Sequence, residues 1–145
     1  LCGRSESIRV YGEAALDLLG FGEVPIAESL SRFEEAQEHL YALFPKLEGF
    51  AGRVMANHLL YEGFPCNRDC ANPDAAFAAF CTAAALLKVL CVCGMAQSDK
   101  KEDLVDILAY TNRYIEHSDY YLVCSKMRHP TGQETLALFL PILRR

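Results

Sequence analysis

The sequence lacks the motifs that are typical of common catalytic and cofactor chemistries. Its 145 residues contain no glycine-rich phosphate loop after a strand, no G-x-S-x-G nucleophile turn and no H-E-x-x-H zinc motif. No segment shows the clean apolar–polar alternation of a half-buried strand, and no strand–helix–strand pattern occurs. These absences argue against a nucleotide-binding sheet and leave cofactor binding by a standard motif unsupported.

Clustered positive charge is also missing. The chain has 19 Asp and Glu against 14 Lys and Arg, for a net charge of −5, and the only adjacent basic pairs are Lys100-Lys101 and Arg144-Arg145. Binding to phosphates requires clustered Lys and Arg, and a polybasic membrane patch requires the same. We therefore expect neither nucleic acid nor an anionic membrane surface as a partner.

A secretory start and a disulfide framework are lacking as well. The chain begins at Leu1 without a charged start and an apolar run, so we expect one helical domain, residues 1–145, cut from a longer protein. Its seven cysteines are odd in number and lie mostly in apolar runs, where free Cys behaves as a small hydrophobe. We expect a reducing, cytoplasmic location.

What the sequence does contain is helical periodicity along almost its whole length. Asn72 reads as an N-cap before Pro73, and Asp99 with Glu102 resembles a capping box. With short connections, the pattern predicts an all-α protein, an antiparallel bundle of five to six helices around a central apolar helix at about 73–96. The predicted helices are 8–19, 25–44, 46–62, 73–96 and 100–126, with a further piece at 134–143 and a loop at 63–72.

Three of these helices have distinct apolar patterns. The apolar stripe of the second is Ile26, Leu30, Phe33, Ala36/Gln37, Leu40 and Leu43/Phe44, and that of the third is Leu47, Phe50, Val54, His58 and Tyr61. The fourth is apolar nearly all round and long enough for a bilayer. Lys88 deep in that run, the many alanines and the amphipathic neighbours favour a buried core helix, so no membrane span is expected.

The fifth helix carries two stripes, and the second contains an imidazole. The first is Leu104, Ile107/Leu108, Thr111, Tyr114/Ile115, Ser118 and Leu122; the second is Tyr110, Arg113/Tyr114, His117, Tyr121 and Cys124. Two packing faces imply burial, so spacing alone favours His117 as a core histidine with tyrosine partners. The alternative is a polar pocket in which His117 binds a ligand or acts as a general base.

The third helix and the following loop offer further polar candidates. Arg53, Asn57 and Tyr61 recur every four residues, and Asn57 either holds a polar group of a substrate or bonds a neighbouring helix, which spacing favours. If this helix packs on the fifth, Asn57, His58 and His117 converge. Cys66 and Cys70 lie in a loop, but zinc needs two more ligands, so we expect no metal; a reversible disulfide suits the pair better.

One combination of segments resembles a known family. Asn57-His58-Leu59-Leu60-Tyr61, then Phe64-Pro65, a long apolar helix, and Tyr114-Ile115-Glu116-His117-Ser118 resemble the C-terminal part of flagellin lysine-N-methylases over residues 47–140. The resemblance implies methyl transfer from S-adenosylmethionine to lysines of flagellin or another lysine-bearing protein. It implies a candidate pocket of Asn57, His58, Tyr61, Tyr114, Glu116 and His117. The cysteine-rich, metal-binding-like region of the family is absent, and Cys66 and Cys70 do not replace it.

Two other functions stay open at the level of sequence. A binding module would meet a Lys-rich protein through the acidic face of the second helix, formed by Glu28, Glu34, Glu35 and Glu38, although such a run is more often an ordinary solvated face. A purely structural domain would instead stabilise the remainder of the parent chain. These possibilities differ in what they predict for His117. In a functional site its side chain is exposed, whereas in a purely structural domain it is buried.

Overall fold

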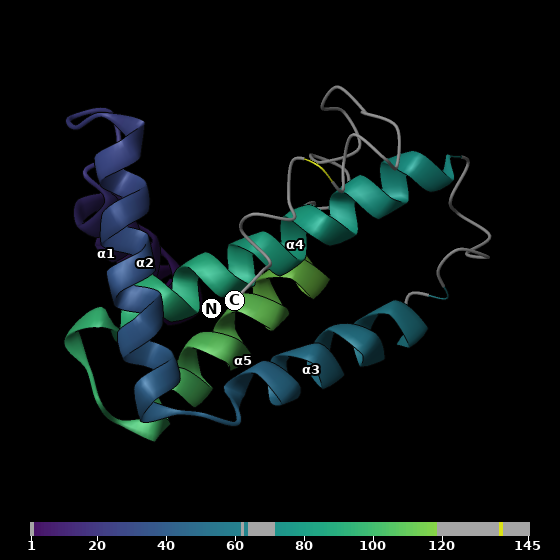
Figure 1. Ribbon diagram of the computed structural model, residues 1–145. Helices are drawn as coiled ribbons and strands as arrows, with labels where there is room; N and C mark the ends of the chain where they lie inside the picture. Colours follow the sequence, from purple (N-terminus) through teal and green to yellow (C-terminus); the bar gives the residue numbers. More distant parts are fainter. Residues whose placement is uncertain (1, 62, 64–71, 119–136, 138–145) are drawn as a thin grey trace. The chain divides into compact units, whose positions relative to one another are not determined.

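The protein is all-α, as the sequence predicts. The computed structural model describes residues 2–61, 63, 72–118 and 137. Within these ranges there is no strand, and the helices are α1 (Cys2–Leu19), α2 (Ile26–Leu43), α3 (Leu47–Tyr61), α4 (Pro73–Gly94), the 3-10 helix η1 (Met95–Gln97) and α5 (Lys101–His117) (Figure 1). The predicted continuation of the fifth helix over 119–126 and most of the piece at 134–143 lie outside the described residues.

The chain divides into two compact units. The first comprises residues 1–47 and 89–114, which contain α1, α2, the last residues of α4, η1 and most of α5. The second comprises residues 48–88 and 115–145, which contain nearly all of α3, the longer part of α4 and the end of α5. Each unit is described by itself.

In the first unit, α1 and α2 are joined by a tight, heavily bonded turn. Gly20 and Gly22 have φ of +59° and +83°, values that glycine adopts at little cost. The N–H groups of Glu23 and Val24 both donate to the carbonyl of Gly20. From α2, Ser29 Oγ donates to the carbonyl of Leu19 at 2.7 Å, so a carbonyl at the end of α1 that lacks a helical partner is satisfied.

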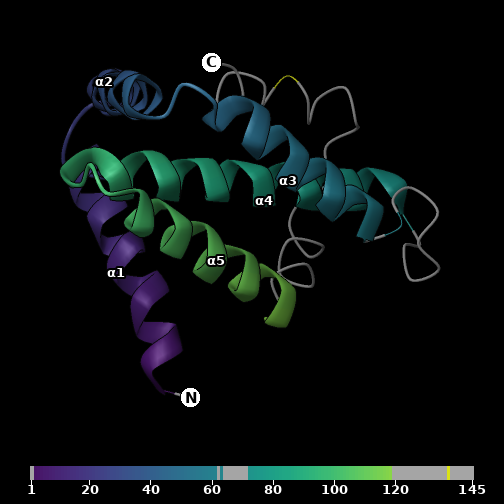
Figure 2. The ribbon, with the colours of Figure 1, turned by 90° about the horizontal axis from the view of Figure 1, so that it is seen from below.

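The core of the first unit forms where α2 and α5 meet the end of α4 (Figure 2). A close approach occurs at Gly94, where an added Cβ would lie 2.7 Å from Cδ1 of Ile107 and 3.6 Å from a ring carbon of Tyr11. Burial, with the negative charges of Asp106 and Asp103, raises the pKa of Tyr11, which places this α1 residue beside α5. The buried side chains described in this unit are Ala15, Ala36, Leu40, Leu47, Leu90, Cys91, Val92, Cys93, Met95, Leu104, Ile107, Leu108 and Thr111.

In the second unit, α4 begins at the cap that the sequence predicts. The side-chain oxygen of Asn72 accepts hydrogen bonds from the N–H groups of Asp74 and Ala75 at 3.0 and 3.3 Å. Beyond the cap, this helix buries small side chains, namely Ala79, Cys81, Ala83, Ala84 and Ala85, and then Leu87. The prediction that α4 is a core helix is consistent with this burial.

The cap of α5 differs from the prediction. Asp99 does not form the expected box with Glu102; its carboxylate lies 3.2 Å from Nε2 of His39 on α2. Ser98 forms the hydrogen bonds at this end of the helix instead. Its Oγ accepts a hydrogen bond from the N–H of Lys100 at 3.2 Å and donates one to the carboxylate of Asp103. Ser98, one residue upstream of Asp99, thus bonds the N–H of Lys100 just before α5, and Asp99 instead contacts α2.

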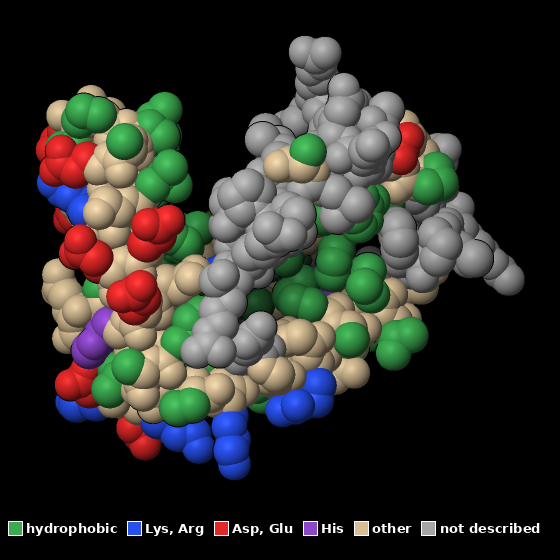
Figure 3. Space-filling model, in the orientation of Figure 1, with side chains coloured by type: hydrophobic (Ala, Val, Ile, Leu, Met, Phe, Trp, Pro, Cys, Tyr) green, Lys and Arg blue, Asp and Glu red, His purple; other side chains and the backbone are tan. Residues whose placement is uncertain are grey.

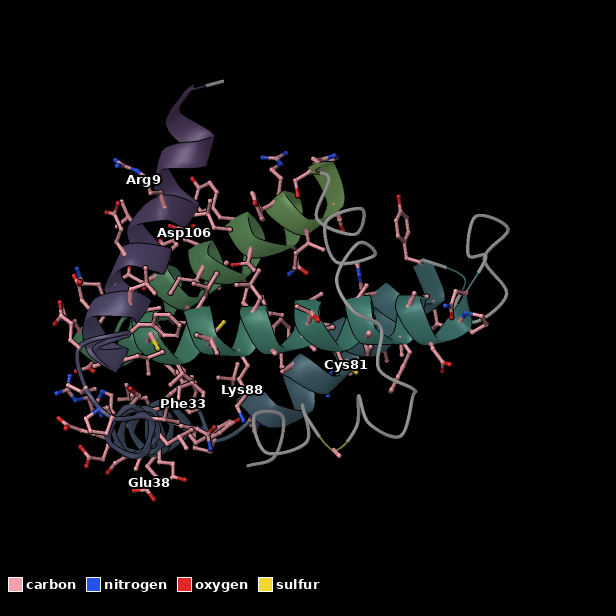
Figure 4. All side chains as sticks on the ribbon, turned by 90° about the horizontal axis from the view of Figure 1, so that it is seen from above. Arg9, Phe33, Glu38, Cys81, Lys88 and Asp106 are labelled. Atoms are coloured by element: carbon pink, nitrogen blue, oxygen red, sulfur yellow. The ribbon has the colours of Figure 1, made fainter. Side chains whose placement is uncertain are left out.

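Two predicted apolar stripes are only partly buried. On α2 the stripe packs from Phe33 onward, and Figure 4 shows Phe33 pointing toward α4 and Glu38 pointing to the other side of the helix. The earlier members Ile26 and Leu30 are exposed. On α3, Leu47 and His58 are buried, but Phe50 and Tyr61 are exposed. Both stripes are therefore wrong at these four residues, because helical spacing identifies a face but not how far along it another helix packs.

One helical segment is long and apolar enough to cross a membrane by length and composition alone. It runs over α4 and η1, residues 73–97, and 56% of its most apolar window is buried inside the protein. A core helix of a soluble protein passes the same test, so this segment is weak evidence of a membrane span.

Candidate functional site

The end of α5 does not bury its imidazole. His117 is exposed, as are Arg113 and Tyr114, so the predicted second packing face is wrong over these residues, while Tyr121 and Cys124 lie outside the described residues. The first stripe is confirmed from Leu104 to Ile115. Since Ile115 points into the core, His117, two residues or about 200° further round the helix, points away from it.

The same geometry exposes Glu116. Ile115 keeps only 3% of its surface exposed and anchors the last turn of α5. Glu116 follows it about 100° round the helix, and its side chain is exposed. The segment that best matches the family resemblance therefore presents a carboxylate and an imidazole to solvent from one anchored helical turn.

Among the described residues, the buried histidine is on α3 instead. His58 is 8% exposed, and its ring stacks on Phe80 of α4 with centroids 6.3 Å apart and planes 18° apart. Stacking of this kind buries the ring faces and fixes the side chain. The sequence contained a signal for this contact. Phe77 and Phe80 are the only aromatic residues on α4, and the small alanines around them leave room for a large side chain from another helix.

The exposed face of α3 carries the other polar candidates. Arg53, Asn57 and Tyr61 all have exposed side chains, and their spacing of four residues places them along one side of the helix. An added Cβ on Gly49 would lie 3.6 Å from Nη1 of Arg53, so the arginine side chain folds back over this glycine. The side chain of Asn57 is exposed, and its predicted hydrogen bond to a neighbouring helix stays a prediction.

Two apolar side chains on this face are exposed, which their helical spacing did not predict. Phe50 is 44% exposed and Leu60 is 79% exposed, and both lie within about 80° of Asn57 on a helical projection. Together with Tyr61, which is 81% exposed, they give α3 an outer face that is part polar and part apolar. Helical spacing predicts Phe50 and Tyr61 on the buried stripe. Spacing does not indicate how far along α3 a neighbouring helix extends, so it cannot predict which members of the stripe are covered.

The structure brings some of the predicted site residues into one unit. Asn57, Tyr61, Glu116 and His117 all belong to the second unit and are exposed. Within the described ranges, no hydrogen bond or ion pair joins the first two of these residues to the last two. His58 belongs to the same unit but is buried, whereas Asn57 and His117 are exposed, and the predicted convergence of Asn57, His58 and His117 stays a prediction.

Three cysteines on α4 are structural. Cys81, Cys91 and Cys93 are free and buried, and burial raises the pKa of the Cys91 thiol to about 12 and that of Cys93 to about 11. The thiolate is the nucleophile and the metal ligand, so these thiols are poorly suited to either role. Among the residues that the structure describes, no group of three His, Cys, Asp or Glu side chains is placed to hold a metal. Cys66 and Cys70 lie outside them.

No family model, curated protein or solved structure matches this chain. Its function is therefore inferred from its own residues.

Proposed function

We propose that this chain is the C-terminal helical domain of a protein resembling flagellin lysine-N-methylase, and that it contacts the lysine-bearing protein during methylation that depends on S-adenosylmethionine. Support comes first from the resemblance of segments 57–61 and 114–118 to that family. A cytoplasmic location belongs to the same proposal, since the buried thiols Cys81, Cys91 and Cys93 are free.

One observation carries the proposal: both segments bury an anchor and expose their polar groups. In segment 114–118 the anchor is Ile115, and Glu116 and His117 are exposed. In segment 57–61 the anchor is His58, and Asn57 is exposed. The carboxylate of Glu116 and the imidazole of His117 are therefore both accessible to another protein from one anchored turn.

The exposed groups suit recognition of a lysine side chain. A carboxylate such as that of Glu116 attracts the ammonium group, and the ring of Tyr61 attracts it through its π face. Methyl transfer requires a neutral amine, whereas free lysine has a pKa of about 10.4. An imidazole nitrogen is a proton acceptor, so we assign His117 the role of receiving the ammonium proton.

The described faces do not fit S-adenosylmethionine itself. Pockets for small ligands bury about 70–90% of the ligand surface, whereas Tyr61 and Leu60 are 81% and 79% exposed on the outer side of a helix. Such a face suits contact with a protein surface. We therefore assign no group that holds the cofactor to Asn57, Tyr61, Glu116 or His117, and the proposal places its binding elsewhere in the parent protein.

The cofactor part of this proposal is tested by titration calorimetry with S-adenosylmethionine. The chain described here and its full-length parent are titrated separately. We expect binding by the parent and none by the isolated chain, because the exposed faces offer no enclosure. Absence of binding by both proteins would refute methylation by this route.

The substrate part is tested by single substitutions in the full-length parent. His117→Ala is expected to lower lysine methylation at least about 100-fold, the low end for a lost general base, with unchanged far-UV circular dichroism. His39→Ala is the matched control, because His39 is also exposed but lies in the first unit. Equal activity of the His117 and His39 variants would contradict the proposed role of the α5 end.

A second candidate function is a non-catalytic interaction or structural module. The observation that favours it is the exposed apolar surface of α3, namely Phe50, Leu60 and Tyr61, since exposed apolar groups gathered on one face mark contacts with other proteins or domains. Under this alternative Leu60→Ser weakens association with the parent chain or a partner, and His117→Ala leaves methylation unchanged.

A further inference from the structure

The turn between α1 and α2 and the first turns of α2 expose three large apolar side chains. Phe21 is 76% exposed, Ile26 80% and Leu30 54%. Figure 3 shows hydrophobic side chains gathered at the end of the molecule where α1 meets α2 and acidic side chains further along α2. We name Phe21, Ile26 and Leu30 the apolar tip of the first unit.

The apolar tip is held in place rather than loose. Phe21 lies between two glycines with positive φ, and its N–H donates to the carbonyl of Leu16 at 3.1 Å. Arg32 Nη1 donates to the carbonyl of Leu18 at 3.3 Å. An added Cβ at Gly20 would meet Val24 at 3.0 Å, so the turn is closely packed beneath Phe21. Because the backbone that carries Phe21 is already ordered, binding at this turn loses little backbone entropy.

An acidic row continues the apolar tip along α2. Ile26, Leu30, Glu34 and Glu38 follow one another at intervals of four residues, and all four are exposed. Glu28, which lies off this row, pairs with Arg32 at 2.6 Å. Within the described part of the chain, Glu34 and Glu38 form no such ion pair. The exposed row of α2 is therefore apolar at its start and carries unneutralised negative charge towards its end.

We propose that this surface docks an amphipathic helix of another protein whose contact face carries apolar residues at one end and lysines at the other. The apolar end of that helix lies on Phe21, Ile26 and Leu30, and its lysines lie opposite Glu34 and Glu38. An amphipathic helix binds such a groove or face through anchor side chains spaced three or four residues apart. This docking does not depend on the proposed methylation, and the experiments below test it separately.

A second copy of the chain does not complement this surface. In a symmetric pair with antiparallel α2 helices that covers the whole row, Ile26 would face Glu38 and Leu30 would face Glu34, which sets apolar groups against carboxylates. An antiparallel pair centred on Ile26 and Leu30 would instead leave Glu34 and Glu38 without a partner charge. In a parallel symmetric pair, each Glu34 would face its own copy, since a two-fold interface repeats the same patch. An anionic membrane surface is disfavoured as well, because Glu34 and Glu38 would be repelled by it. Charge complementarity thus selects a cationic helix.

The test uses two fluorescein-labelled synthetic peptides of 18 residues. Each has leucines along one helical face, with lysines on the second half of that face in one peptide and glutamates there in the other. Binding to the chain is measured by fluorescence anisotropy at low and high salt. The Lys peptide is expected to bind at low salt, more weakly at high salt, and the Glu peptide is expected not to bind.

Variants locate the binding surface. Phe21→Ser is expected to weaken binding of the Lys peptide roughly tenfold or more, as loss of a central aromatic anchor does. Glu34→Gln/Glu38→Gln is expected to weaken it several-fold, about 3–10-fold, and to flatten its salt dependence. The matched control Glu13→Gln/Glu102→Gln removes the same charge from exposed sites on α1 and α5.

Each outcome decides the proposal. Selective weakening by the α2 and Phe21 variants supports it. It is overturned if the control pair weakens binding as much as Glu34→Gln/Glu38→Gln does, because the attraction is then only net charge. It is also overturned if the Glu peptide binds equally well, or if sedimentation shows that the chain dimerises and that Phe21→Ser abolishes the dimer.

Discussion

A buried hydroxyl without a partner gives the sharpest prediction about stability. Thr111 on α5 has no exposed surface, and its Oγ1 has no hydrogen-bond partner among the described residues. Leaving a buried hydroxyl unsatisfied costs about 1–3 kcal/mol. Valine has the same branched shape without the oxygen, and its helix propensity is close to that of threonine. Thr111→Val should therefore raise the free energy of unfolding by about 1–2 kcal/mol.

The assay is urea unfolding followed by far-UV circular dichroism, with thermal unfolding as a second measurement. For a chain of this size, a gain of that order raises Tm by roughly 2–8 °C. Thr111→Ser separates the hydroxyl from the methyl group, because it keeps the unsatisfied oxygen and opens a small cavity; it should lower stability by about 1 kcal/mol. An unchanged urea m value would show that the unfolded state is unaffected.

Thr82→Val is the matched control on α4. Its Oγ1 donates to the carbonyl of Ala78 at 2.7 Å, so its hydroxyl is satisfied. Removal of that bond should be neutral or cost up to about 1 kcal/mol. The reasoning is refuted if Thr111→Val lowers the stability, or if the two valine variants change it by the same amount and in the same direction.

Three further predictions concern the first unit. Ser29→Ala loses the bond to the end of α1 and should cost about 1 kcal/mol by urea unfolding, whereas Ser31→Ala, whose Oγ is exposed and 3.5 Å from a carboxylate, should cost almost nothing. Gly94→Ala should cost roughly 1–3 kcal/mol in the same assay, because the new methyl group meets the buried Ile107; a gain in stability would contradict the close approach. Because burial raises the pKa of Cys91 to about 12, the unfolded thiol ionises first, so stability should fall between about pH 9 and 12, and Cys91→Ala should reduce that fall.

The fold was predictable because helix signals are local. Asn72 and Pro73 mark the start of α4 by chemistry within one turn, and the structure shows that cap. The stripe from Leu104 to Ile115 lies on one face at any packing angle, so its burial followed from spacing alone. The cap of α5 was mistaken because Ser98 and Asp99 both have suitable side chains, and the contact with His39 comes from residues 60 positions away.

The candidate site was less predictable for a related reason. Periodicity shows which residues share a face, but not which faces meet another helix. His58 and His117 both lay on plausible apolar stripes, and the partner that decides between them, Phe80, is distant in sequence. Ile26 and Leu30 likewise fit a core stripe that extends beyond the surface available to cover it. Only tertiary packing separates a buried imidazole from an exposed one.

The close approach at Gly94 has a consequence for recognising relatives of this chain. The space that a Cβ at 94 needs is occupied by Cδ1 of Ile107, so the two positions are energetically coupled and their substitutions are not additive. A side chain at position 94 requires either a shift of Cδ1 of Ile107 or a shorter side chain at position 107. Homologous chains are expected to have either glycine at position 94 with isoleucine at 107, or alanine at 94 with valine at 107. This covariation of two positions would indicate homology where overall sequence similarity does not.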